Sequence, residues 1–194
     1  MPLEIRVRLP NDRRNTGTLE MVDTITGLTL FGPIPALGRA ARNTAAAHGN
    51  PNGLSTLPFG DTPTGGYRLP MVLRSGANTN HPADVYGSSG VIVLDPVSGD
   101  ALTAKNNGRT GLLIHSGRQI STPTPLPSHL RPTNGCIRVL ERDLAALVQA
   151  MRDNAFLFPG DVTLTVGPNG PQGTMDENVS DGDPPPLTGT PVVP

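Results

Sequence analysis

The sequence is poor in cysteine and aromatic residues, and each shortage excludes a class of structure. The 194 residues include one cysteine, no tryptophan and an aromatic content of 3%. A lone cysteine cannot form an intrachain disulfide, and a zinc site normally draws on several Cys and His ligands. No apolar run approaches the roughly 20 residues that a transmembrane helix needs. A net charge of −1 lacks the basic footprint of a nucleic-acid-binding domain. We therefore expect no metal, no membrane span and no nucleic-acid partner.

Glycine and proline are abundant, with 23 and 22 residues. Such a composition favours a turn-rich, mostly β fold over a helical bundle, and the length suits one domain with room for a tail. The alternation of apolar and charged residues from Leu3 to Leu9 predicts a half-buried strand. We expect further strands at residues 19–22, 28–31, 67–69, 85–94, 112–115 and 161–166. Pro33 and Pro35 are expected to end the strand over 28–31, because proline lacks a backbone donor.

One segment predicts a principal helix. From Arg142 to Asn154 the apolar residues recur at helical spacing, and four of them share one face: Leu144, Leu147, Val148 and Met151. Residues 36–48 allow a second, short helix. The fold class expected from these patterns is mostly β with one principal helix.

The two ends of the sequence differ from its body. Residues 167–194 are rich in Gly and Pro, contain four acids and lack Lys and Arg, so we expect a disordered acidic tail. Residues 1–17 are expected to form an N-terminal strand or extension, and residues 18–166 the main domain. The N-terminus lacks the continuous apolar stretch of a secretory signal. The expected alternatives are a cytoplasmic protein, an exported protein without its signal, or cargo of another secretion route.

The lone thiol, Cys136, lies in the segment TNGCIR over residues 133–138, and His115 follows the apolar run Leu112 to Ile114. Cysteine attacks as a thiolate and needs a base or a positive field nearby, which His115 can supply. The carbonyl or hydroxyl of Ser116 can hold the imidazole in one tautomer, as the third member of a triad does. The alternative is that Cys136 is a small buried hydrophobic residue and His115 a buried histidine with its hydrogen bonds satisfied.

Other polar residues have less specific interpretations. The backbone N–H groups of Gly135 and Cys136 can form an oxyanion hole. No acid lies close to His115 in sequence, so a carboxylate that orients it would have to come from the fold. The start of the last helix, with Glu141, Arg142 and Asp143, is interpreted as exposed, with acids that suit the helix dipole. His81 and His129 are expected in surface loops, and Tyr67 is expected to pack on a sheet.

Two separated motifs resemble those of the L,D-transpeptidase (YkuD) family. Seventeen residues separate His115 from Thr133, and the segment Thr133-x-Gly-Cys-Ile-Arg138 matches the family's nucleophile motif. The turn Thr62-Pro-Thr-Gly65, which precedes the strand at 67–69, is similar to the family's Thr-Pro-x-Gly element. The resemblance covers about residues 18–166. Asn134 is a departure, because the family commonly has His at this position, and it changes the hydrogen bonding of the pocket.

The resemblance implies a YkuD-like domain of the β-sandwich or barrel-like type that transfers acyl groups on peptidoglycan stem tetrapeptides through a Cys136 thioester. It implies no metal or organic cofactor. By position it implies Cys136 as nucleophile, His115 as base, Ser116 as the group that orients His115, and four substrate or oxyanion residues: Thr133, Asn134, Gly135 and Arg138. The acceptor of the acyl group decides between an L,D-transpeptidase, an L,D-carboxypeptidase and an enzyme that exchanges D-amino acids.

Three further functions remain as alternatives. An interbacterial toxin would use the same chemistry on a rival's envelope, with a secretion system or an immunity protein as partner. A non-catalytic module would bind the cell wall, with Cys136 as a buried relic. A cysteine peptidase would act on ordinary proteins. The first two, like the enzyme itself, place the protein in the periplasm or cell envelope.

Overall fold

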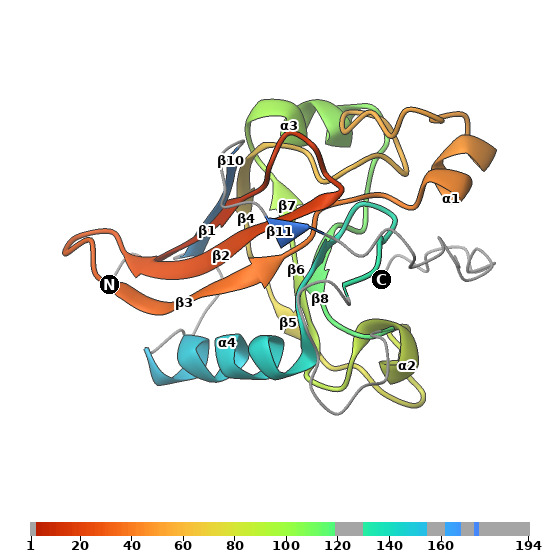
Figure 1. The fold of residues 1–194 in the computed structure, drawn as a ribbon. Helices are drawn as coiled ribbons and strands as arrows, with labels where there is room; N and C mark the ends of the chain where they lie inside the picture. Colours follow the sequence, from red (N-terminus) through yellow and green to blue (C-terminus); the bar gives the residue numbers. More distant parts are fainter. Residues whose placement is uncertain (1–2, 119–129, 155–161, 168–172, 175–194) are drawn as a thin grey trace.

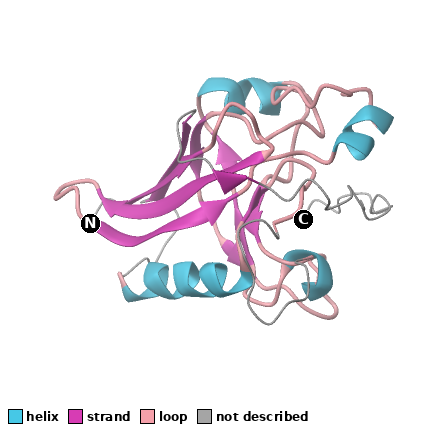
Figure 2. Cartoon of the chain, in the orientation of Figure 1, coloured by secondary structure: helices cyan, strands magenta, loops and turns pink. Residues whose placement is uncertain are grey.

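The computed structural model describes residues 3–118, 130–154, 162–167 and 173–174. This part of the molecule is built mainly from strands, with one long helix (Figures 1 and 2), which confirms the predicted fold class. Its strands form a seven-stranded and a four-stranded sheet. Neither sheet closes into a barrel within the described residues. The predicted loop residue His129 and most of the predicted tail lie outside these residues.

The large sheet has the strand order β11-β2-β1-β10-β4-β7. The seventh strand, β3, lies outside this order and also pairs with β2. The N-terminal strand is internal: β1 runs antiparallel to β2 and parallel to β10. The strands are β1 (Leu3–Arg8), β2 (Asn15–Asp23), β3 (Thr29–Ala36), β4 (Gly65–Arg68), β7 (Asp95–Pro96), β10 (Val162–Gly167) and β11 (Gly173–Thr174). The short strand β11 belongs to the segment predicted to be a tail, and it pairs with the start of β2.

The predicted first strand is confirmed by its burial pattern. Leu3, Ile5 and Val7 are fully buried, because successive side chains of a strand point to opposite faces. On the other face Arg6 Nε donates to Glu4 Oε2 at 2.8 Å. The apolar face therefore packs into the core, while the charged face stays partly exposed.

The expectation that two prolines end the second hairpin strand is wrong. β3 continues through Pro33 and Pro35 to Ala36, and Pro35 is paired with Thr18 of β2. β3 is hydrogen-bonded only to β2 among the described strands, so it is an edge strand, where a missing N–H donor can face away from the ladder.

The small sheet has the order β5-β6-β8-β9 and is made of very short strands. They are β5 (Val72–Leu73), β6 (Val91–Val93), β8 (Leu113–His115) and β9 (Ile137–Arg138). β8 and β9 are parallel, with His115 opposite Arg138. The predicted strand at 85–94 is wrong in its first part, where the single-turn helix α2 (Ala83–Tyr86) ends at Gly87, which has φ +84°.

The principal helix α4 (Glu141–Asp153) is confirmed, and its four predicted apolar residues are buried. It packs against β3, below the large sheet in Figure 1. Helix α1 (Arg42–Ala47) lies within the predicted 36–48 segment. Helix α3 (Gly99–Asn106) was not expected from the sequence, because it buries only Ala101 and Ala104 and shows little apolar periodicity. None of the helices in the described ranges is long and apolar enough to cross a membrane.

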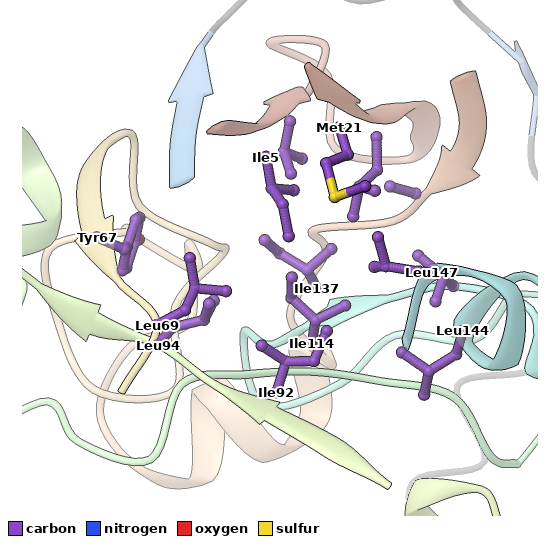
Figure 3. Close-up of a cluster of buried hydrophobic side chains, with 14 of the residues drawn as sticks. Ile5, Met21, Tyr67, Leu69, Ile92, Leu94, Ile114, Ile137, Leu144 and Leu147 are labelled. Atoms are coloured by element: carbon purple, nitrogen blue, oxygen red, sulfur yellow. The ribbon is translucent and has the colours of Figure 1, made fainter. Parts of the chain in front are cut away.

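One hydrophobic core joins both sheets and α4. Figure 3 shows Ile114 of β8 and Ile137 of β9 between Ile5 of β1 and Ile92 of β6. Burying each such side chain contributes about 1.5–3 kcal/mol. These two buried isoleucines fix β8 beside β9, and the residues that adjoin them in sequence, His115 and Cys136, are thereby held in the same region.

Candidate active site

A cavity of about 310 Å³ opens where β8 ends and β9 begins. Its walls include five of the seven predicted site residues: His115, Thr133, Asn134, Cys136 and Arg138. The other two, Ser116 and Gly135, adjoin these wall residues in sequence and hydrogen-bond to them. The structure therefore gathers the predicted residues around one cavity.

His115 is buried at the end of β8 and is held by its neighbour's main chain. The distance from His115 Nδ1 to the Ser116 carbonyl oxygen is 2.7 Å. A carbonyl only accepts hydrogen bonds, so Nδ1 carries the proton and Nε2 keeps its lone pair. Burial, assisted by the charge of Arg138, lowers the pKa of His115 to about 3, which leaves the imidazole neutral at pH 7. The ring of Tyr86 packs against it, with centroids 5.0 Å apart.

Cys136 is 9% exposed and also lines the cavity. Burial raises the pKa of its thiol, while a backbone hydrogen bond with Leu113 and the charges of Arg109 and Arg138 act in the opposite direction. Cys136 Sγ is 3.7 Å from the carbonyl oxygen of Gly111. Within the described residues no hydrogen bond joins Sγ to His115. The resting pair is thus a thiol and a neutral imidazole that share a cavity.

The turn before Cys136 is shaped by glycine. Gly135 has φ +100°, and an added Cβ would lie 1.8 Å from Arg109 Nη2, so only glycine fits. The Gly135 N–H donates to Thr133 Oγ1 at 2.9 Å, and that hydroxyl donates to the carbonyl of Cys136 at 2.9 Å. The Gly135 N–H is therefore engaged inside the turn.

The two sequence motifs meet in space. Thr62, of the Thr-Pro-x-Gly element, is fully buried, and its hydroxyl donates to the carbonyl of Gly135 at 2.9 Å. Arg109 Nη2 donates to the carbonyls of Gly60 at 2.6 Å and Gly135 at 3.3 Å. Arg109 thus clamps the turn of the nucleophile motif onto the 55–61 loop. Sequence reasoning missed it, because its partners are distant backbone carbonyls that leave no local pattern.

Arg138 is a buried cation with unused donors. It is 3% exposed, and its Nε and Nη1 find no hydrogen-bond partner among the described residues. Burial, together with the nearby charges of Arg118 and Arg131, lowers its pKa to about 10, so it remains protonated at pH 7. A buried guanidinium with free N–H groups is the complement of a carboxylate.

Tyr86, which the sequence did not single out, connects two histidines. Its ring is tilted against His115 and meets His81 edge-on, with 5.0 Å between centroids in each pair. His81 is therefore packed beside the site, and burial lowers its pKa. Tyr67 is buried as predicted, and its hydroxyl donates to the carbonyl of Pro63 at 2.7 Å. In the described ranges no group of three or more His, Cys, Asp or Glu side chains is placed to hold a metal ion.

The interpretation of Glu141 as part of an exposed helix start is wrong. Its carboxylate accepts hydrogen bonds from the side chains of Ser88, Ser89 and Ser116. No local sequence pattern indicates these contacts, since Ser88 and Ser89 lie more than 50 positions away. A carboxylate therefore does come to the site from the fold, and it reaches Ser116 rather than the imidazole.

The likeness of this chain to known proteins lies in its structure. No family model matches the sequence, and no curated protein matches it. A crystal structure of an L,D-transpeptidase from Mycobacterium tuberculosis H37Rv is similar with 16% identity and a TM-score of 0.41, over 85% of this chain. The matched part is 57% of that protein, so the chain spans little more than half its length. A likeness of this size does not decide the chemistry, which rests on the geometry of the site.

Proposed function

We propose that the protein is a peptidoglycan-modifying cysteine acyltransferase that acts on stem tetrapeptides. The observation that carries this proposal is the composition of one cavity, which combines the only thiol of the sequence, an imidazole bound through Nδ1, and a buried guanidinium with free donors. A nucleophile, a base and an anion-binding group are the parts that acyl transfer from an acidic peptide requires.

The proposed reaction begins with proton transfer from Cys136 Sγ to His115 Nε2. The sulfur forms a bond to the peptide carbonyl carbon, and the oxyanion is stabilised by the backbone N–H of Cys136 and by the side chain of Asn134, because the Gly135 N–H is bound to Thr133. The C–N bond to the terminal D-alanine then breaks, and its amine leaves with the proton from His115. The thioester is resolved by an amine, by water or by a free D-amino acid, whose proton passes back through His115 to the thiol.

Arg138 supports an acidic substrate. A stem tetrapeptide ends in the carboxylate of D-alanine, and a hydrogen bond between two charged groups contributes about 1.5–3 kcal/mol. Arg138 lines the cavity, and its buried Nε and Nη1 have no hydrogen-bond partner among the described residues, so a carboxylate bound beside it would supply one. Peptidoglycan lies in the envelope, so we place the activity there. The toxin role and its secretion or immunity partners remain predictions.

The deciding experiment is incubation with disaccharide tetrapeptides followed by mass spectrometry. Wild-type protein should accumulate a thioester on Cys136 and release D-alanine, or yield a dimer or an exchanged terminus, and each product identifies one acceptor. Cys136→Ala should abolish all of these products while its circular dichroism and thermal unfolding stay those of the wild type. Wild-type turnover in folded Cys136→Ala would exclude the proposal.

A non-catalytic cell-wall-binding module is the second candidate, because burial raises the pKa of the Cys136 thiol. The two candidates differ in how the thiol reacts with a small neutral alkylating reagent. If His115 is the base, the Cys136 thiol of the wild type should be alkylated faster than that of the His115→Gln variant. A structural cysteine should be slow and indifferent to this substitution, while binding of the intact protein to insoluble peptidoglycan would persist.

A further inference from the structure

Glu141 is the first residue of α4 and the centre of a hydrogen-bond network that the reaction above does not use. Its Oε1 accepts from the backbone N–H of Ser88 at 3.0 Å and of Ser89 at 2.9 Å. The same oxygen accepts from the two hydroxyls, at 2.8 Å from Ser88 and 2.6 Å from Ser89. Its Oε2 accepts from Ser116 Oγ. One carboxylate therefore links three segments, which are the start of α4, the 88–89 turn and the end of β8.

We infer that Glu141 is a positioning residue for the imidazole of His115, acting through Ser116 and the segment that carries Tyr86. The inference rests on the proposed function in taking His115 as the base. Among the described residues Glu141 makes no hydrogen bond to the imidazole, so it acts on the geometry of the ring and exchanges no proton with it.

Two short routes connect Glu141 to the imidazole ring, one through Ser116 and one through the 88–89 turn. Through Ser116, Glu141 holds the residue whose carbonyl oxygen lies 2.7 Å from His115 Nδ1. Through Ser88 and Ser89, it holds the turn that follows α2, which ends in Tyr86. The backbone N–H of Ser116 donates to the carbonyl of Tyr86 at 3.2 Å, which joins the two sides. The hydrogen-bond acceptor and the aromatic neighbour of the imidazole thus depend on one carboxylate.

The backbone segments around Glu141 and Ser116 are tightly packed. A Cβ added to Gly87, which has φ +84°, would lie 1.8 Å from Ser116 Oγ and 2.1 Å from Glu141 Oε2. A Cβ on Gly117, with φ +80°, would lie 2.4 Å from the carbonyl oxygen of Val85. The two glycines let the backbones approach closely enough for the carboxylate to bridge them. A contact that tight transmits a shift of the carboxylate directly to Ser116.

The carboxylate of Glu141 is ionised at pH 7. Burial acts to raise its pKa, but hydrogen bonds from Ser116, Ser89 and Ser88 outweigh burial and leave the pKa below its ordinary value. An ionised carboxylate only accepts, and every group that faces it here is a donor. Glutamine keeps one acceptor oxygen but replaces the other with an NH2 group and removes the negative charge, so Glu141→Gln weakens these charge-assisted bonds at nearly constant volume.

The test reads the imidazole directly and needs no peptidoglycan. In ¹⁵N-labelled wild-type protein, long-range NMR correlations of His115 should show the Nδ1–H tautomer alone. In Glu141→Gln and Glu141→Ala we expect a mixture with the Nε2–H tautomer. The rate of Cys136 alkylation by a neutral reagent should fall about 10-fold, which is part of the 10²–10⁴-fold contribution of a well-placed base. Arg142→Ala, an exposed change on the same helical turn, is the matched control and should change neither readout.

A single Nδ1–H tautomer and wild-type alkylation in folded Glu141→Gln would overturn the inference. If the variants at 141 do not fold, Ser116→Ala keeps the carbonyl that binds His115 and removes the hydroxyl, with its bond to Glu141 and its longer bond of 3.3 Å to the carbonyl of Tyr86. A mixed tautomer in Ser116→Ala then supports the inference, and an unchanged tautomer overturns it. Failure of the wild type to process tetrapeptides would overturn the proposed function and leave the tautomer result standing, so the two failures are distinguishable.

Discussion

The two sheets differ in what they bury. In the large sheet the inward positions of β1 are Leu3, Ile5 and Val7, and charged residues face outward. In the small sheet β8 and β9 each bury an isoleucine beside a polar residue, so that Ile114 adjoins His115 and Ile137 adjoins Arg138. The strand β1 of the large sheet thus buries apolar side chains alone, whereas the small sheet has short strands and buried ionisable groups.

We infer from this difference that the large sheet mainly stabilises the fold and that the small sheet carries the reactive groups. Burying a polar group without a partner costs free energy, and the unpartnered guanidinium of Arg138 is such a group. The small sheet can hold it because Ile114 and Ile137 are anchored in the core that the large sheet provides. Substitutions in the large sheet should therefore change folding alone, while those in the small sheet should change reactivity.

The largest effect is expected for His115→Gln in the small sheet. Loss of the base should reduce thioester formation by about 10²–10⁴-fold, because the thiol then has no neighbouring proton acceptor. Single-turnover mass spectrometry with tetrapeptides measures this step. Thioester formation within about threefold of the wild type would show that His115 is not the base.

The matching change in the large sheet is Ile5→Ala. Truncation of a fully buried Ile should lower the free energy of unfolding by about 2–5 kcal/mol, and Ile5→Val by about 0.5–1.5 kcal/mol. Urea denaturation gives these values. The alkylation rate of Cys136, measured where both proteins are folded, should stay at the wild-type value, and a fall in that rate would break the division between the sheets.

Arg138→Met should sharpen the contrast within the small sheet. Removal of the guanidinium should lower kcat/KM for tetrapeptides by about 10–100-fold, the equivalent of one lost charged hydrogen bond. The free energy of unfolding should stay the same or rise by about 1 kcal/mol, because an uncompensated buried charge is removed. A strongly destabilised Arg138→Met would mean that the guanidinium serves the fold.

Taken per pH unit, the smallest effect is the pH dependence of stability. The unfolded chain protonates His115 near pH 6.5, but the folded protein does so only near its pKa of about 3. Between these values the unfolded state holds one more proton, so stability falls as the pH falls, by up to about 1.4 kcal/mol per pH unit. Urea denaturation at pH 4.5, 5.5 and 6.5 should show this slope. It should shrink in His115→Gln to the smaller contribution of His81, whose pKa is also lowered.

Local sequence patterns predicted the strands and helices whose apolar residues recur at a clear spacing. The alternation over Leu3 to Leu9 and the apolar face of α4 were sufficient, because each reflects burial on one side. The single turn of α2 and the weakly apolar α3 were missed, since neither has a clear periodicity. The continuation of β3 through Pro33 was missed for another reason, because being an edge strand is a property of the whole sheet.

The same limit applies to the candidate site. Cys136, His115 and the Ser116 carbonyl were predicted from short local segments; the structure places Cys136 and His115 in the wall of one cavity and the Ser116 carbonyl against the His115 ring. Arg109 and Glu141 were not predicted as parts of the site. Their partners lie 25 or more residues away in sequence, so only the assembled fold reveals them.

The parallel pairing of β1 with β10 has a consequence for folding. Leu3 of β1 is paired with Val162 of β10, so a long stretch of sequence joins the two strands. Forming so distant a pairing is slow, and until it forms one edge of β1 stays unpaired. The large sheet is therefore completed only once β10 has docked, and a chain truncated before β10 would expose the open edge of β1 to other molecules.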